Sequence, residues 1–148
     1  IQLLIAGDGP LLNDYMEKSK LHKNIKLLGW VKNKKKFFEK IDIFCSASSF
    51  EPFGLTILEA MLNRVPVIST DCRGPKDIIN DNENAILIRH NNKKDLILAL
   101  ERIKNNNTLR KRLIKNGLET VKNKYNIKVY KERLFSIIYR FVKDKNES

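Results

Sequence analysis

Short apolar segments recur along the chain, with more polar stretches between them. The apolar segments cover residues 1–7, 25–31, 41–47, 65–70 and 85–88. Each is continuously hydrophobic rather than alternating, which in short strands is typical of a parallel sheet buried on both faces by helices. The pattern therefore predicts an α/β fold with a doubly wound parallel sheet.

The stretches between these segments carry helical signals. Helices are expected at about 10–22, 33–40, 54–63 and 75–80, followed by a helical tail with breaks at 105–107 and at Gly117. Two apolar stripes at helical spacing run along the tail, and we expect both to pack in the core. The first stripe is Leu96, Ile97, Leu100 and Ile103, and the second is Tyr130, Leu134, Ile137, Ile138 and Phe141.

The length of 148 residues suits one domain with its own core. No apolar run approaches the ~20 residues of a membrane helix, and no signal-peptide pattern opens the chain. We therefore expect a soluble, cytoplasmic protein. Cys45 and Cys72 lie far apart with no metal-site spacing around them, which indicates reduced thiols.

The formal net charge of +12 raises the alternative of a non-enzymatic basic module that binds nucleic acid or anionic membrane. The excess is mostly lysine and comes with abundant asparagine and isoleucine, a mixture that A/T-rich coding sequence produces without functional pressure. Basic side chains are interleaved with aromatic ones at 31–38 and 122–131, but no recognised nucleic-acid-binding module accompanies them. Nucleic acid is disfavoured as a partner, and peripheral contact with anionic lipid stays open.

Two segments resemble ligand-binding motifs only superficially. Residues 7–10, GDGP, lie between a predicted strand and a predicted helix, but a dinucleotide fingerprint needs a glycine where the chain has Leu12. We interpret this segment as a tight turn and expect no NAD. The acidic stretch at 81–83 is surrounded by asparagines, which is typical of a polar turn rather than a metal site.

The segment 48–61, SSFEPFGLTILEAM, is the strongest candidate for chemistry. It leaves a predicted strand at its carboxyl end, where ligands bind in open α/β sheets. The next helix should begin near Phe53 or Gly54. Its first amides have no intrahelical partners, and the helix dipole adds about half a positive charge there. This helix end is therefore suited to a phosphate.

Two acids flank that helix end. Glu59 is the only charged side chain between Pro52 and Asn63, on a helix whose composition predicts burial nearly all round. It lies about 7.5 Å along the axis from Gly54, within reach of ribose hydroxyls, while Glu51 precedes the helix. The alternative is that Glu59 is simply exposed and that Glu51 is a helix-start acid favoured by the helix dipole. The cost of burying an unpaired charge favours a bracketed diphosphate.

The segment 51–61 resembles the Glu-x7-Glu signature of the GT-B retaining glycosyltransferases of family 4, which use nucleotide-diphosphate sugars. The likeness continues in order through LLIAGDGP, IKLLGWV, PVISTDCRGPKDII at 66–79 and NENAILI. The phrase within 66–79 is similar to members that build bacterial surface polysaccharides. The resemblance implies a Rossmann-like sheet forming the carboxy-terminal half of a GT-B glycosyltransferase.

The resemblance also implies roles for single residues. Glu51 would lie by hydroxyls of the donor sugar, a catalytic-site acid that positions the sugar rather than attacking it. Glu59 would hold the ribose, and Val31 would lie against the base. The backbone amides of three consecutive residues would take the diphosphate: Phe53, Gly54 and Leu55.

The implied activity is transfer of a sugar from a UDP-, GDP- or ADP-linked donor, with retention of configuration. The implied acceptor is a cell-surface polysaccharide or a lipid-linked glycan. No metal or other cofactor is expected, because a helix end and basic side chains can neutralise the leaving diphosphate.

Parts of the family pattern fall outside the chain. The family's Arg and Lys pair on the diphosphate, and its amino-terminal acceptor domain, come before the strand with which the chain opens. Residues 1–148 are therefore expected to be one donor-binding domain, truncated at its amino-terminal side and inactive alone. The last helix resembles the segment that crosses back onto the acceptor domain, which would leave part of its apolar stripe exposed.

Overall fold

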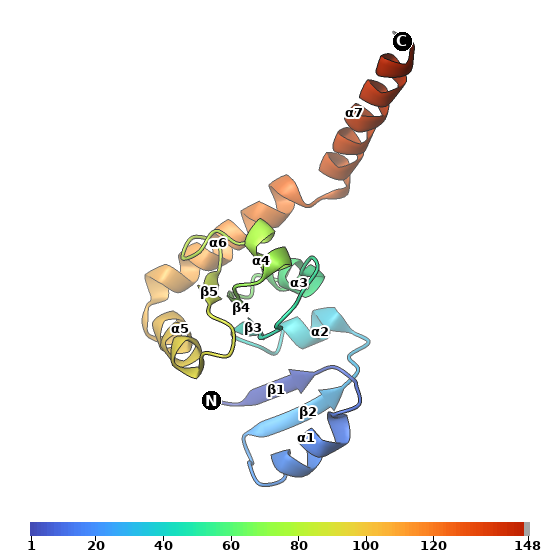
Figure 1. Cartoon of the computed structure of the whole chain (residues 1–148). Coiled ribbons are helices and arrows are strands. Elements are labelled where there is room, and N and C mark those ends of the chain that lie inside the picture. Colours follow the sequence, from blue (N-terminus) through green and yellow to red (C-terminus); the bar gives the residue numbers. More distant parts are fainter. Residues whose placement is uncertain (147–148) are drawn as a thin grey trace. The chain divides into compact units, whose positions relative to one another are not determined.

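The computed structural model describes residues 1–146, with side chains up to residue 143. The chain forms two compact units, Ile1–Lys40 and Ile41–Ser148. The prediction of one donor-binding domain over 1–148 stays a prediction. The first unit contains β1 (Leu3–Ala6), α1 (Leu12–Ser19), β2 (Ile25–Gly29) and α2 (Lys34–Phe38). The second contains β3 (Phe44–Ser46), α3 (Leu55–Leu62), β4 (Val67–Thr70), α4 (Arg73–Ile78), β5 (Ile86–Ile88), α5 (Lys93–Asn105), α6 (Asn107–Lys124) and α7 (Ile127–Asn146) (Figure 1).

The first unit is a two-stranded parallel sheet with α1 packed on β2. The predicted burial on both faces is wrong here, because Leu3 and Ile5 of β1 are 47% and 38% exposed. Two strands and one packed helix offer too little apolar surface to cover both faces. The segment 7–10 forms a turn between β1 and α1, as predicted, with the amide of Gly9 donating to Asp8 Oδ1.

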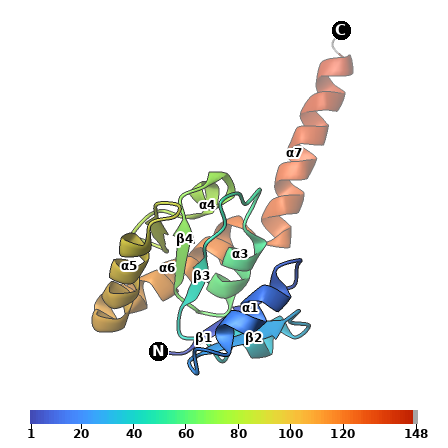
Figure 2. The same cartoon turned by 60° about the horizontal axis from the view of Figure 1, so that its bottom comes forward.

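The second unit is built on a parallel sheet with strand order β3-β4-β5. Helices α3 and α5 lie on opposite sides of this sheet (Figure 2), so β4 is buried at all four positions. The predicted α/β fold with helices on both faces of a parallel sheet is confirmed here. The core combines side chains of β4, β5, α5 and α6: Ile68, Ile86, Ile88, Ala99, Ile103, Leu109 and Leu113.

The tail helices break at different places than predicted. The break near 105–107 is confirmed, and Asn106 caps α6 by accepting a hydrogen bond from the amide of Leu109. The break at Gly117 is wrong, because α6 runs through it and ends only before Tyr125. A Cβ at Gly117 would lie 3.1 Å from Met61 Cγ. Glycine serves close packing of α6 on α3, not helix termination.

The two apolar stripes of the tail differ in burial. In α5, Ile103 is fully buried and Leu96 and Leu100 pack against the core, while Ile97 is 55% exposed. In α7, every side chain from 131 to 143 is exposed, so the prediction of core packing for the second stripe is wrong. Figure 1 shows α7 extending away from the sheet and helices of its own unit. The exposed stripe agrees with what the resemblance implied. Within residues 1–146, no helix is long and apolar enough to cross a membrane.

Candidate functional site

The β3–α3 loop, residues 47–54, leaves the carboxyl end of β3 and leads into α3. Gly54 caps the helix with φ of +100°, a left-handed conformation that disfavours other residues. A Cβ there would lie 3.2 Å from Ile57 Cδ1 and 3.3 Å from Ile78 Cδ1. Position 54 therefore favours glycine chiefly for its backbone angle, with little space for a Cβ beside the two isoleucine side chains. The predicted start of the helix is confirmed to within two residues.

Glu51 folds its carboxylate onto the tip of the helix. Its Oε1 accepts hydrogen bonds from the amides of Gly54, at 3.0 Å, and Phe53, at 3.3 Å. The expectation that these two amides are unpaired is therefore wrong, and the alternative of a helix-start acid describes this contact correctly. A carboxylate satisfies such amides well because the helix dipole favours negative charge at this end.

The next two amides of the helix remain open. Within the described part of the chain, the amides of Leu55 and Thr56 have no hydrogen-bond acceptor, whereas those of Ile57 and Leu58 bond to the carbonyl of Gly54. Leu55 and Thr56 are also exposed. Because unpaired amides at a helix start attract anions, the amides of residues 55 and 56 are the ones still open to an acceptor.

Glu59 lies one turn along the same helix, on its more open side. The helix buries Ile57, Leu58, Ala60 and Met61 against the rest of the unit. The prediction of burial nearly all round is wrong, because Leu55 and Leu62, beside Glu59, are 64% and 55% exposed. Glu59 itself is half-buried with Oε2 shielded from solvent, so the alternative of an exposed acid is also wrong.

Three contacts from other elements hold the β3–α3 loop. At the end of β4, the hydroxyl of Thr70 donates to the carbonyl of Ser48. At the start of α4, the amide of Gly74 donates to the carbonyl of Glu51 over 2.9 Å. The ring of Phe53 meets the ring of Tyr125 edge-on, with centroids 6.0 Å apart. The loop is therefore fixed by segments far from it in sequence.

Sequence reasoning missed Gly74 and Tyr125. Tyr125 lies between α6 and α7, and its hydroxyl donates to the carbonyl of Asp77. Burial raises the pKa of this hydroxyl, and the nearby Asp77 carboxylate raises it further while Arg133 opposes the change. Tyr125 thus stays protonated and can keep donating. A glycine in RGPKD was a visible signal for Gly74, but nothing in the sequence marks Tyr125.

Val31 lies in the first unit, two residues after β2, and is half-buried, next to a largely exposed Trp30. Its implied contact with a base stays a prediction. Cys45 and Cys72 are not joined, as expected. No group of three His, Cys, Asp or Glu side chains within the described residues is arranged to hold a metal ion. The expectation that the chemistry needs no metal stays a prediction.

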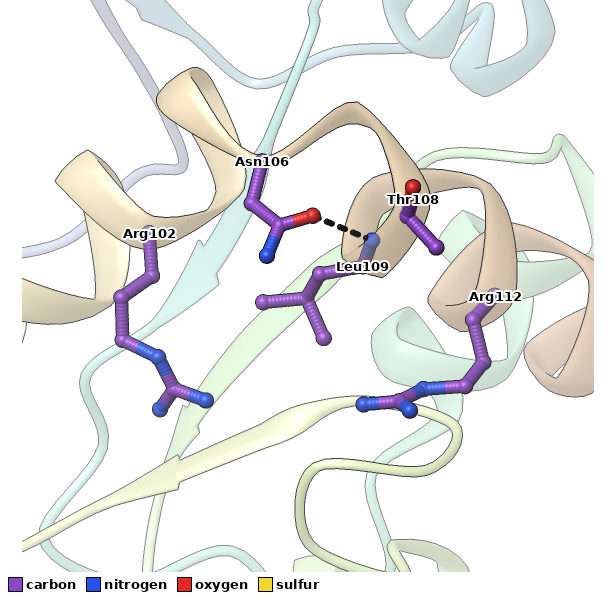
Figure 3. Close-up of a pocket in the computed structure, with 5 residues that line it drawn as sticks. All are labelled: Arg102, Asn106, Thr108, Leu109 and Arg112. Carbon is purple, nitrogen blue, oxygen red and sulfur yellow. Dashed lines mark hydrogen bonds between the residues drawn. The ribbon is translucent and has the colours of Figure 1, made fainter.

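A separate hollow of about 180 Å³ lies where α5 meets α6 (Figure 3). Figure 3 shows Arg102 and Arg112 reaching into it from the two helices, with Asn106 bonded to the amide of Leu109. Both guanidinium groups are already bonded to Asn82, one to its side chain and one to its carbonyl. None of the residues predicted for the site lines this hollow, so it is distinct from the α3 tip.

The model of the family described as glycosyl transferases group 1 matches residues 1–120. The chain belongs to this family. The lipopolysaccharide core biosynthesis glycosyltransferase LpsE of Rhizobium meliloti is 33% identical over 120 residues, covering 75% of this chain and 35% of that protein. The poly(ribitol-phosphate) alpha-N-acetylglucosaminyltransferase of Staphylococcus aureus is 28% identical, covering 93% of this chain and 29% of that protein. The chain thus spans about a third of the length of these relatives.

Solved structures agree on the fold of this family member. A mutant of TarM from S. aureus, in complex with fondaparinux, alpha-GlcNAc-glycerol and UDP, matches with a TM-score of 0.82 and 28% identity, over 92% of this chain and 28% of that one. The C-terminal domain of LpcC from Francisella tularensis matches with a TM-score of 0.67 and 29% identity, over 78% of this chain and 60% of that one. The predicted fold class, the carboxy-terminal half of a GT-B glycosyltransferase, is confirmed.

Proposed function

We propose that this family member is the donor-binding part of a retaining glycosyltransferase. It binds a nucleotide-diphosphate sugar whose sugar is transferred to a polysaccharide or lipid-linked glycan. The observation that carries this proposal is the α3 tip, where two open amides lie between Glu51 and Glu59. Relatives named for lipopolysaccharide core and poly(ribitol-phosphate) glycosylation, and the UDP in the TarM complex, support the substrate class. The proposal includes a cytoplasmic location with peripheral membrane contact.

The open amides of Leu55 and Thr56 take the diphosphate in this proposal. Leu55 keeps the role that the resemblance implied, and Thr56 is added because its amide is open. The amides of Phe53 and Gly54 act indirectly, by orienting Glu51. Glu59 accepts hydrogen bonds from the ribose hydroxyls, which its place one turn along α3 allows.

The two carboxylate oxygens of Glu51 have different roles in this proposal. Oε1 holds the loop amides, and Oε2 has no hydrogen-bond donor among the described residues, so it can accept from hydroxyls of the donor sugar. The nucleoside diphosphate then leaves, stabilised by the α3 amides and dipole, while the acceptor enters on the same face. Glu51 positions the sugar and forms no covalent bond. No step uses a metal ion.

Calorimetry with UDP, GDP and ADP tests the proposal on the protein as its gene encodes it. We expect one nucleotide to bind and Glu59→Ala to weaken it by about tenfold, or about 1.4 kcal/mol, because the ribose loses its acceptor. Glu119→Ala removes an exposed acid on α6 and should leave the affinity unchanged. Equal affinity of wild type and Glu59→Ala removes the ribose role, and absence of binding by all three nucleotides overturns the proposal.

A further inference from the structure

The β3–α3 loop and the start of α4 are in direct backbone contact. We propose that Gly74 is a positioning residue that sets the β3–α3 loop in the register needed to bind the donor diphosphate. This inference rests on the proposed function of the loop. It concerns a residue that touches neither nucleotide nor sugar and acts through Glu51 and Phe53.

The contact leaves no room for a side chain at Gly74. Its amide donates to the carbonyl of Glu51 over 2.9 Å. A Cβ at this position would lie 2.5 Å from that carbonyl oxygen, 2.5 Å from the amide nitrogen of Phe53 and 2.7 Å from its Cα. All three are backbone atoms, so no rotamer change can relieve the overlap.

Backbone conformation does not explain the glycine. Positive φ angles occur at Gly7, Gly9, Gly29 and Gly54, and Gly74 is not among them. Position 74 therefore requires glycine only because α4 and the loop approach so closely. Gly117 also has an ordinary φ and close packing, but its neighbours are less close. A Cβ there would lie 3.1 Å from the flexible side chain of Met61 and 3.3 Å from the carbonyl oxygen of Asn84.

Helix α4 touches the loop at a second point and is itself held firmly. Ile78 Cδ1, from the other end of α4, fills the space beside Gly54. The carbonyl of Ile78 accepts from the side chain of Asn84, and the carbonyl of Asp77 accepts from Tyr125. A side chain at 74 would therefore press on the backbone of Glu51 and Phe53 with an anchored helix behind it, and would shift the loop at these two residues.

Displacing the loop would disturb the α3 tip directly. The carboxylate of Glu51 bonds to the amides of Phe53 and Gly54 from its present position. Phe53 and Gly54 directly precede Leu55 and Thr56, whose amides are open. Since hydrogen bonds to a phosphate depend on the position of the donating amides, even partial relief of the overlap should weaken donor binding.

Gly74→Ala in the protein as its gene encodes it tests the inference, with Gly117→Ala as the control. We expect Gly74→Ala to weaken UDP binding at least about tenfold by calorimetry and to shift the amide NMR resonances of Phe53 and Gly54. Gly117→Ala should leave the affinity for UDP and both resonances unchanged, whatever it does to thermal stability. Unchanged resonances and affinity in Gly74→Ala, or equal effects of the two substitutions, overturn the inference.

If Gly74→Ala does not fold, hydrogen exchange in the wild-type protein tests whether Gly74 positions the β3–α3 loop. UDP should slow hydrogen exchange at the Gly74 amide more than at the Gly117 amide, because the Gly74 amide is bonded to the loop that UDP stabilises. Equal or absent protection overturns the inference. A wild-type protein that binds none of UDP, GDP and ADP overturns the proposed function instead, while the two resonances still report whether Gly74 sets the loop.

Discussion

At the scale of the residue, Asn84 is a buried polar side chain that makes three hydrogen bonds in the second unit. It is buried, and its Oδ1 accepts from the amide of Asn80 over 2.9 Å. Its Nδ2 donates to the carbonyl of Ile78 and to the hydroxyl of Thr120, each over 3.0 Å. One side chain thus joins the end of α4 to α6, and through α4 it supports the β3–α3 loop.

Asn84→Ala should lower the free energy of unfolding by about 2–3 kcal/mol, because it leaves buried backbone groups without partners. Urea denaturation followed by circular dichroism measures this loss. Asn123→Ala is the matched control, since Asn123 is exposed on α6 and its removal should change stability by less than about 0.5 kcal/mol. Similar midpoints for the two variants would contradict the role given to Asn84.

The sequence predicted which residues lie at the candidate site, but not where their side chains point. The pattern 51–61 located the start of α3 to within two residues, and the roles of the two acids stay predictions. It could not tell that Glu51 turns back onto the amides of Phe53 and Gly54, because that depends on the backbone path of the β3–α3 loop. Gly74 contacts Glu51 across more than twenty residues, a proximity that spacing along one chain does not encode.

At the scale of the element, α7 differs from every other long helix of the second unit. Its apolar stripe is exposed: Tyr130, Leu134, Ile137, Ile138 and Phe141 range from 41% to 70%. The spacing of apolar residues predicted an amphipathic helix correctly, but periodicity alone does not say which surface covers the stripe. By contrast α6, with similar spacing, buries Leu109 and Leu113 in the core.

Removing residues 131–148 from the printed chain should change the free energy of unfolding by less than about 1 kcal/mol, because the described side chains beyond 130 are exposed. Leu113→Ala, a substitution in the buried core, should cost about 2–5 kcal/mol in the same urea titration. If the truncation is as destabilising as the core substitution, α7 packs on the unit in solution.

At the scale of the whole molecule, net charge and family membership point to different partners. The charge of +12 favours polyanions in general, but such attraction is nonspecific and falls steeply between about 50 mM and 200 mM salt. Family membership over residues 1–120 and the GT-B fold support the nucleotide sugar that we propose. The ordered motifs predicted this fold from the sequence. They did not predict the exposure of β1, because that depends on how much apolar surface the neighbouring strand and helix offer to cover it.

The most direct test of the account is an amide NMR titration of the protein, as its gene encodes it, with UDP at about 0.15 M salt. If the α3 tip binds the diphosphate, the resonances of Leu55 and Thr56 shift most and saturate with UDP. Unmoved resonances at these two positions, with shifts instead at Thr108 beside the arginine-lined hollow of α5 and α6, would contradict it.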